Sequence, residues 1–259
     1  MKSKPLILVT NDDGITAPGI KVLVEEARKL GEVVVVAPDS PQSGMGHAVS
    51  ISDPIRLHPV KVFEGIEAYE CSGTPVDCVK LAKHIVLKDR EVDLCVSGIN
   101  HGSNASINII YSGTLSAAME ASLEGIPSIG FSHLDANYHA NFEPSRPYIS
   151  QLMKFVLEKG MPLGNLLNVN IPNLPANQIK GMRICRQAQA RWKEEFVEAI
   201  DPRGVKYYWL TGVFVNEDSA NDTDLNALEN GYISVVPSMH DLTHYPMLNT
   251  LKSENGIFS

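Results

Sequence analysis

The segment that follows the short polar N-terminus reads Leu6-Ile7-Leu8-Val9-Thr10-Asn11-Asp12-Asp13-Gly14-Ile15, an apolar run that ends in two adjacent carboxylates and a glycine. Branched apolar residues bounded by turn formers predict a buried strand of a parallel sheet, and Asp-Asp-Gly predicts the turn that leaves its carboxyl end. Ligands of open α/β sheets bind outside the carboxyl ends of the strands. Two neighbouring carboxylates repel each other there, which favours a hard divalent cation such as Mg²⁺, Mn²⁺ or Ca²⁺ between them. The alternative is a solvated turn in which one Asp caps the next helix.

Strand-like and helix-like patterns alternate along the chain after this first strand. Apolar runs typical of buried strands lie at residues 32–37, 92–97, 128–131 and 166–171, and helical spacing lies at residues 20–30, 75–85, 115–121 and 148–157. This alternation predicts a mostly parallel sheet with helices on both faces, a three-layer α/β/α, Rossmann-like architecture forming a single domain over residues 1–259. The alternating segment 49–57 predicts a half-exposed antiparallel strand.

Composition excludes several classes of partner. The net charge is −8, from 22 basic and 30 acidic residues, and there is no basic cluster, so we expect no nucleic-acid polymer as a partner. No apolar segment reaches membrane-spanning length, and residues 1–5 lead into the first strand without a signal-peptide pattern. The cysteines lack paired metal-type spacing and fit a reducing compartment; they are Cys71, Cys78, Cys95 and Cys185. We therefore expect a cytoplasmic protein with no membrane partner.

A second local pattern indicates an anion site. Ser112-Gly113-Thr114 directly precedes the small-residue helix pattern at residues 115–121. Free backbone N–H groups and the positive end of the helix dipole would face a phosphate there. Plain helix capping by Ser112 or Thr114 is the simpler interpretation, and it is compatible with phosphate binding.

Four short motifs occur in one order along the chain: Asn11-Asp12-Asp13-Gly14-Ile15, then Ala37-Pro38-Asp39 with Ser43-Gly44, then Ser97-Gly98-Ile99-Asn100, then Tyr111-Ser112-Gly113-Thr114. Together they resemble the SurE family, the metal-dependent survival-protein phosphatases that act on nucleoside monophosphates. The resemblance covers nearly the whole chain, is strongest over residues 5–130, and returns over residues 186–209. Four motifs in one order are far more specific than any one of them.

The resemblance implies that one divalent cation, Mg²⁺ or Mn²⁺, is bound by Asp12, Asp13, Ser43 and Asn100. Carboxylate, hydroxyl and amide oxygens are all hard ligands, so the residue types fit such an ion. Asp12, Asp13 and Asn100 are the expected catalytic residues, with Asp12 or Asp13 accepting a proton from the attacking water.

The resemblance also places the substrate phosphate at Ser112, Gly113 and Thr114, with Asn11 and Asn104 as hydrogen-bonding neighbours. Relatives often carry a histidine in a Pro-Leu-His-x-Asp-Leu-Thr-like segment near the C-terminus. Here residues 237–243 read Pro-Ser-Met-His-Asp-Leu-Thr, so His240 stands one residue late. Because a one-residue offset can point a side chain the opposite way, a role for His240 stays open.

Residues 186–212 are rich in Arg, Trp and Tyr around the turn Asp201-Pro202-Arg203-Gly204, which predicts a long hairpin. Such residues are typical of interface cores, and the resemblance implies an arm that contacts a neighbouring subunit in a homodimer or homotetramer. The alternative is a hairpin folded back on its own core. Residues 237–259 form a separate C-terminal segment.

We therefore expect a metal-dependent phosphomonoesterase acting on nucleoside 5′-monophosphates, with 3′-monophosphates and short polyphosphate as further substrates that the resemblance allows. A receiver-like signalling domain also has an acid pair after its first strand, but it needs a phospho-accepting Asp at a central strand end, and residues 96–100 contain no carboxylate. A nucleotide-binding module without catalysis is the other alternative. The dinucleotide-binding version would carry Gly-x-Gly-x-x-Gly after the first strand, where residues 11–14 read Asn-Asp-Asp-Gly.

Overall fold

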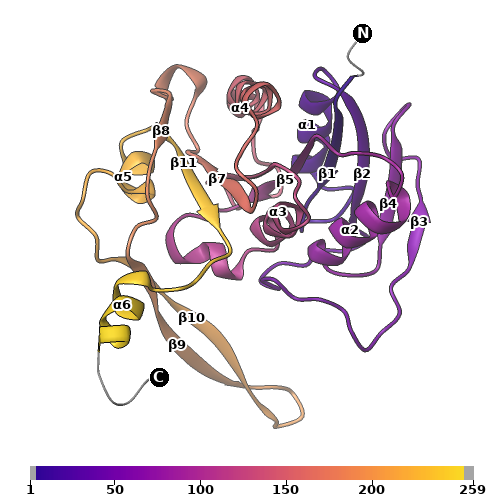
Figure 1. Ribbon diagram of the computed structural model, residues 1–259. Coiled ribbons are helices and arrows are strands. Elements are labelled where there is room, and N and C mark those ends of the chain that lie inside the picture. The colour runs from indigo at the N-terminus through magenta and orange to yellow at the C-terminus, as the bar shows by residue number, and fades with distance from the viewer. Residues whose placement is uncertain (1–3, 254–259) are drawn as a thin grey trace.

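The structure, a computed structural model, describes residues 4–253 and is built on a nine-stranded sheet with the strand order β3-β4-β2-β1-β5-β6-β7-β11-β8 (Figure 1). The strands are β1 (Leu6–Thr10), β2 (Glu32–Pro38), β3 (Leu57–Pro59), β4 (Glu67–Cys71), β5 (Leu94–His101), β6 (Ser128–His133), β7 (Asn165–Ile171), β8 (Met182–Ile184) and β11 (Ile233–Met239). From β4 through β7 all neighbours in this order are parallel, whereas β3 and β11 join antiparallel. The predicted mostly parallel sheet is confirmed.

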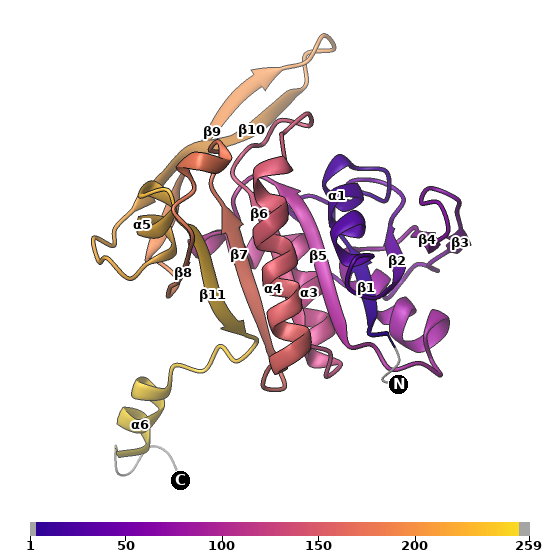
Figure 2. The same cartoon turned by 90° about the horizontal axis from the view of Figure 1, so that it is seen from above.

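Helices cover both faces of the sheet. One face carries α1 (Pro18–Ala27) and α4 (Arg146–Lys159), and the other carries α2 (Pro75–Leu81) and α3 (Gly113–Leu123), as Figures 1 and 2 show. A π-helical turn, Ala82–Val86, continues α2. The short 3₁₀ helices are η2 (Ser106–Tyr111), η3 (Glu143–Ser145) and η4 (Ala176–Gln178), and the remaining α-helices are α5 (Asp224–Glu229) and α6 (Tyr245–Ser253). The three-layer α/β/α architecture is therefore confirmed.

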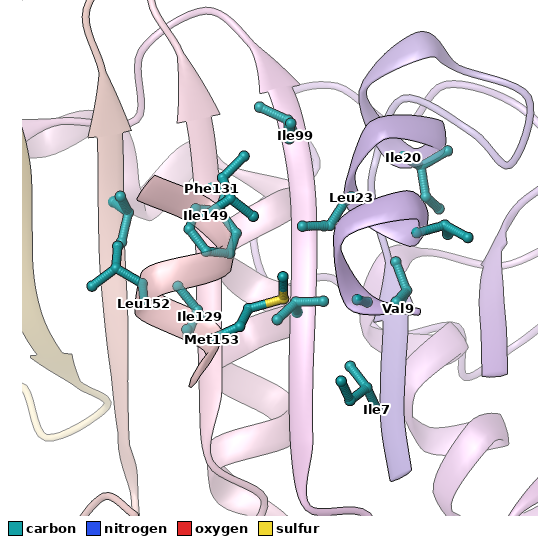
Figure 3. Close-up of a cluster of buried hydrophobic side chains, with 14 of the residues drawn as sticks. Ile7, Val9, Ile20, Leu23, Ile99, Ile129, Phe131, Ile149, Leu152 and Met153 are labelled. Carbon is teal, nitrogen blue, oxygen red and sulfur yellow. The ribbon is translucent and has the colours of Figure 1, made fainter. Parts of the chain in front are cut away.

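The apolar run of β1 is buried on both faces, which explains its lack of polar alternation. Ile7 and Val9 pack with α1 and α4, in the cluster that Figure 3 shows, whereas Leu6 and Leu8 pack with residues of α2 and α3. Full burial of each such side chain stabilises the fold by about 1.5–3 kcal/mol. The central position of β1 fixes the turn that follows it.

Strand order changes direction at β1. The chain passes from β1 to β2 on one side and later returns to place β5 on the other side of β1. The crevice between the carboxyl ends of β1 and β5 is therefore a topological switch point, the usual ligand position of an open α/β sheet. The Asn11-Asp12-Asp13 turn leaves β1 at this point.

A separate antiparallel hairpin, β9 (Ala190–Ile200) with β10 (Lys206–Asn216), forms an arm that projects from the body of the molecule (Figures 1 and 2). The predicted hairpin is present, shifted along the chain from the expected interval 186–212. Nearly all its residues are exposed, so it is not folded back on its own core. The C-terminal segment 237–259 holds the end of β11 and α6, and residues 254–259 lie outside the described residues, as do residues 1–3 of the N-terminal segment.

The strand predicted over residues 49–57 is wrong, because only Leu57–Pro59 pairs, with β4. The backbone of the residues before Leu57 forms hydrogen bonds with side chains and not with a neighbouring strand. Ser50 N donates to the carboxylate of Asp77, and Thr74 Oγ1 donates to the carbonyl of Ala48. Among the helices of residues 4–253, none is long and apolar enough to span a membrane.

Candidate functional site

A cavity of about 320 Å³ opens at the carboxyl ends of β1 and β5. Its lining includes five residues predicted for the site: Asp12, Ser43, Asn100, Asn104 and Ser112. It also includes residues that were not predicted for the site: Gly44, His101, Gly102, Ser103, Asn108, Tyr111 and Trp192. Segments distant in sequence, from residue 12 to residue 192, therefore meet at the switch point of the sheet.

Asp12 lies against the first turn of α3. Only 4% of it is exposed, and its Oδ1 accepts a hydrogen bond from Thr114 Oγ1. A Cβ on Gly113 would stand 2.8 Å from Asp12 Cβ, so glycine permits this close approach. Ser112 caps the helix, accepting a 3.1 Å hydrogen bond from Leu115 N at its Oγ. The predicted acid turn and the predicted anion site thus adjoin.

The carboxylate of Asp12 has no Lys or Arg partner among the described residues. Burial, together with the neighbouring charge of Asp13, raises the pKa of Asp12 to about 6, although the Thr114 hydrogen bond acts in the opposite direction. Within residues 4–253, no ion pair reaches Asp12 and no Lys or Arg lines the cavity. Asp13 is half-buried and pairs with His101, whose Nδ1 lies 3.0 Å from Asp13 Oδ2. A bound cation would relieve the repulsion between the two carboxylates.

The neutral oxygens of the predicted ligand set are also available. Asn100 uses Nδ2 for its hydrogen bonds, to the carbonyls of His101 (3.3 Å) and Gly102 (2.9 Å), which leaves Oδ1 for another partner. Ser43 is exposed in the loop after β2, and this loop is tied to the acid turn by a 2.7 Å bond from Gln42 N to the carbonyl of Asp12.

Buried polar atoms without a partner gather at the same end of the sheet. Among the described residues, Thr10 Oγ1, Asn11 Oδ1 and Ser97 Oγ have no hydrogen-bond partner, and Thr10 lies opposite Ser97 in the β1–β5 register. Residues 4–253 contain no group of three or more His, Cys, Asp or Glu side chains suited to a metal. A metal here would therefore be held by two carboxylates and neutral oxygens, a donor set that fits a hard divalent ion and not zinc.

The two further predicted asparagines have structural partners. Asn11 does not line the cavity, and its Nδ2 donates to the carbonyl of Gly14 (2.9 Å), which braces the turn. Asn104 does line the cavity, and its Nδ2 donates to Ser132 Oγ (2.8 Å).

The chain is similar to known proteins over nearly its whole length. Residues 7–194 match the sequence model of the family described as survival protein SurE. The chain belongs to the SurE family. It is 59% identical to the 5′-nucleotidase SurE of Christiangramia forsetii and 58% identical to that of Cytophaga hutchinsonii, each over 97% of both chains. The crystal structure of the SurE protein from Aquifex aeolicus is 40% identical, with a TM-score of 0.82, over 96% of this chain and 98% of that one.

Two histidines of this SurE-family chain lie elsewhere. His240 and His47 both line a second, mostly apolar cavity of about 870 Å³. His47 Nε2 is 2.9 Å from Glu120 Oε2. Neither lines the cavity that holds Asp12, so the chain by itself does not bring His240 to the predicted site.

His101, which was not predicted as a site residue, is held in a fixed position beside Asp13. Its ring stacks on Tyr138, with centroids 6.0 Å apart, and meets the edge of Phe142 at 5.2 Å. The hydrogen bond with Asp13 raises the pKa of His101, against the opposing effect of burial. In this SurE-family chain the aromatic neighbours thus fix the ring that holds Asp13.

Proposed function

We propose that this chain is a divalent-metal-dependent phosphomonoesterase that converts nucleoside 5′-monophosphates to nucleoside and phosphate. Its nucleotidase activity rests on relatives of that name, which are similar over nearly the whole chain. The metal dependence rests on one observation: the buried carboxylate of Asp12 adjoins that of Asp13 and contacts the start of α3, and no Lys or Arg of the described residues lines its cavity.

Asp12, Asp13, Ser43 and Asn100 are the residues that would hold one cation, Mg²⁺ or Mn²⁺. When bound, such an ion would neutralise charge on the phosphoryl oxygens and so make the phosphorus atom easier for water to attack. Two carboxylates balance the charge of a divalent ion, so a phosphate can still approach the site. The magnesium and manganese forms use the same oxygen ligands, so both are expected to work.

The phosphate itself is expected at the N-terminus of α3. Leu115 N is already used by the Ser112 cap, which leaves the N–H of Gly113 and the hydroxyl of Ser112 for phosphate oxygens. The helix dipole adds to this attraction. Asn104, fixed through Ser132, and Asn11, within the acid turn, keep the surrounding loops in place.

Proton transfer is assigned to the acid pair. Asp12 or Asp13 accepts the proton of the attacking water, and Asn100 completes the group of catalytic residues. His101 Nδ1 donates to Asp13 Oδ2 and so fixes the direction of the remaining carboxylate oxygen.

We also propose that the arm self-associates. Phe196, Tyr208 and Trp209 are exposed on the isolated hairpin, and aromatic side chains of this kind are enriched in interface cores. A homodimer or homotetramer would cover them. A cytoplasmic location is consistent with four free, buried cysteines. Nucleoside 3′-monophosphates and short polyphosphate remain further proposed substrates.

Phosphate release tests this proposal. Protein treated with EDTA is assayed on nucleoside 5′- and 3′-monophosphates and polyphosphate, with and without added Mg²⁺ or Mn²⁺, beside Asp12→Asn. The exposed Asp53, converted to Asn, is the matched control. We expect release that returns with metal, is lost in Asp12→Asn and persists in Asp53→Asn. Folded protein that binds nucleotide but releases no phosphate with either metal would overturn the proposal in favour of a binding module.

A further inference from the structure

Trp192 connects the arm to the candidate active site. It lies near the start of β9, and it lines the same cavity as Asp12 and Asn100. The other arm aromatics, among them Tyr207 and Trp209, are not part of that lining. If the arm served self-association alone, Trp192 would not have to line the cavity that holds Asp12.

The indole ring is held from two sides. Its Nε1 donates a 2.9 Å hydrogen bond to Asn108 Oδ1, and Asn108 Nδ2 donates at 3.4 Å to the carbonyl of Ser103, in the loop that follows Asn100. Phe214, the cross-strand partner of Trp192 on β10, meets the ring at a centroid distance of 5.3 Å and an angle of 61°. These contacts fix the ring plane, yet 43% of the residue remains exposed.

The distribution of chemistry in the cavity is uneven. Among its lining residues, Asp12 and Ser112 offer carboxylate and hydroxyl groups, whereas Trp192 and Tyr111 supply broad aromatic surface. Tyr111 is also exposed. A cavity of about 320 Å³ lies at the lower end of the range for small-ligand sites, roughly 300–1,000 Å³. With the proposed cation held at Asp12, the cavity suits a ligand that carries both an anionic group and a flat apolar ring.

We propose that Trp192 is the wall against which the nucleobase of the substrate stacks, while the phosphate lies at the N-terminus of α3. This inference rests on the proposed nucleotidase function and adds how the base is recognised. Because the indole N–H is already used by Asn108, Trp192 presents only a ring face. Stacking of this kind tolerates every base, so the site distinguishes nucleotides from sugar phosphates and distinguishes poorly between bases. Asn108 acts as a positioning residue.

Kinetics on a matched pair of substrates test the proposal. AMP and ribose 5-phosphate carry the same ester and differ by the base. We expect Trp192→Ala to lower kcat/KM for AMP about tenfold, from a stacking contribution of roughly 1–3 kcal/mol, and to leave ribose 5-phosphate unchanged. Trp192→Phe should restore most of the loss, whereas Asn108→Ala should lower kcat/KM for AMP alone. An equal loss on both substrates, or none on either, would overturn the proposal.

Fluorescence provides a second readout that needs no turnover. The chain has two tryptophans, so Trp209→Phe leaves Trp192 as the sole indole. Adenosine should quench its emission, and ribose should not. No quenching by adenosine at concentrations that inhibit AMP hydrolysis would contradict base stacking. If the unmodified protein hydrolyses neither AMP nor ribose 5-phosphate, the proposed function is wrong. Quenching of Trp192 by adenosine would in that case still show whether Trp192 binds the base.

Discussion

His101 donates its hydrogen bond to Asp13 across an interval of 88 residues, with Nδ1 and Oδ2 at 3.0 Å. The two residues leave neighbouring strands, β5 and β1, at the same edge of the sheet. Tyr138 and Phe142 hold the imidazole in place. The position of one proposed metal ligand thus depends on a side chain outside the proposed ligand set.

Replacing His101 should weaken metal binding. We expect His101→Ala to raise the Kd for Mn²⁺ about tenfold or more, because partners that orient a ligand typically contribute 10–100-fold to metal affinity. His101→Asn keeps a donor near the position of Nδ1 and should lose less. Calorimetric titration of Mn²⁺ into metal-free protein measures both. An unchanged Kd in His101→Ala would show that Asp13 needs no such support.

Substitution of Thr114 by Val, which has nearly the same shape, tests the hydrogen bond from Thr114 to Asp12. Thr114→Val removes the hydroxyl that donates to Asp12 Oδ1 and leaves a buried acceptor without its partner, which costs about 1–3 kcal/mol. Since this hydrogen bond lowers the pKa of Asp12, its removal also favours the protonated form and opposes metal binding. Thr114→Ser keeps the donor and should stay close to the unmodified protein. Equal Mn²⁺ affinity in the two variants would contradict this account of the contact.

Glu26 should make stability depend on pH. Burial opposes its charge, but hydrogen bonds from Lys29, Ser150 and Arg146 outweigh burial and lower its pKa below the ordinary value of 4.5. A lowered pKa means that this stabilisation is present above about pH 4.5 and is lost as the pH falls through the folded-state pKa.

Urea unfolding of Glu26→Gln tests this dependence. We expect a loss of roughly 1–3 kcal/mol at pH 7 that shrinks as the pH is lowered below 4.5, the ordinary value for this group. Glu25 is the matched control, since it pairs with the same Arg146 but is exposed. Glu25→Gln should cost about 1 kcal/mol or less. A loss in Glu26→Gln that is the same at acid and neutral pH would exclude the charge as its source.

The arm should determine the size of the assembly. Replacing the exposed aromatics Phe196 and Trp209 by Ser removes apolar surface without touching the body of the fold. We expect light scattering after size exclusion to give a smaller particle for this variant than for the unmodified chain, which we propose to be a dimer or tetramer. The same change at the exposed Phe155 on α4 serves as the control. An unmodified chain that is monomeric at micromolar concentration would refute self-association through the arm.

The fold was largely predictable because its strongest signals are local. The run from Leu6 to Val9 is apolar on both faces, and the acid turn directly follows it, so strand and site appear together in the sequence. The strand β4 was not predicted, because Glu67-Ala68-Tyr69-Glu70-Cys71 mixes charge with apolar residues near the sheet edge. In residues 49–56 the apolar alternation is misleading, since side chains of Thr74 and Asp77 replace the strand partners.

The candidate site was less predictable where it depends on tertiary contact. Asp12 and Thr114 were both identified, but nothing local indicates that they touch. Asn108 and Trp192 carry no sequence signal for the site. The hydrogen bond between them forms only when β9 packs beside η2. His101 likewise gains its importance from the register of β5 against β1.

A crystal soaked in Mn²⁺ and measured for anomalous scattering tests the central proposal most directly. We expect a single strong peak at the carboxyl ends of β1 and β5, in contact with Asp12, Asp13, Ser43 and Asn100, and no such peak in Asp12→Asn. A peak bound by other residues, or no peak at Mn²⁺ concentrations that support phosphate release, would contradict it.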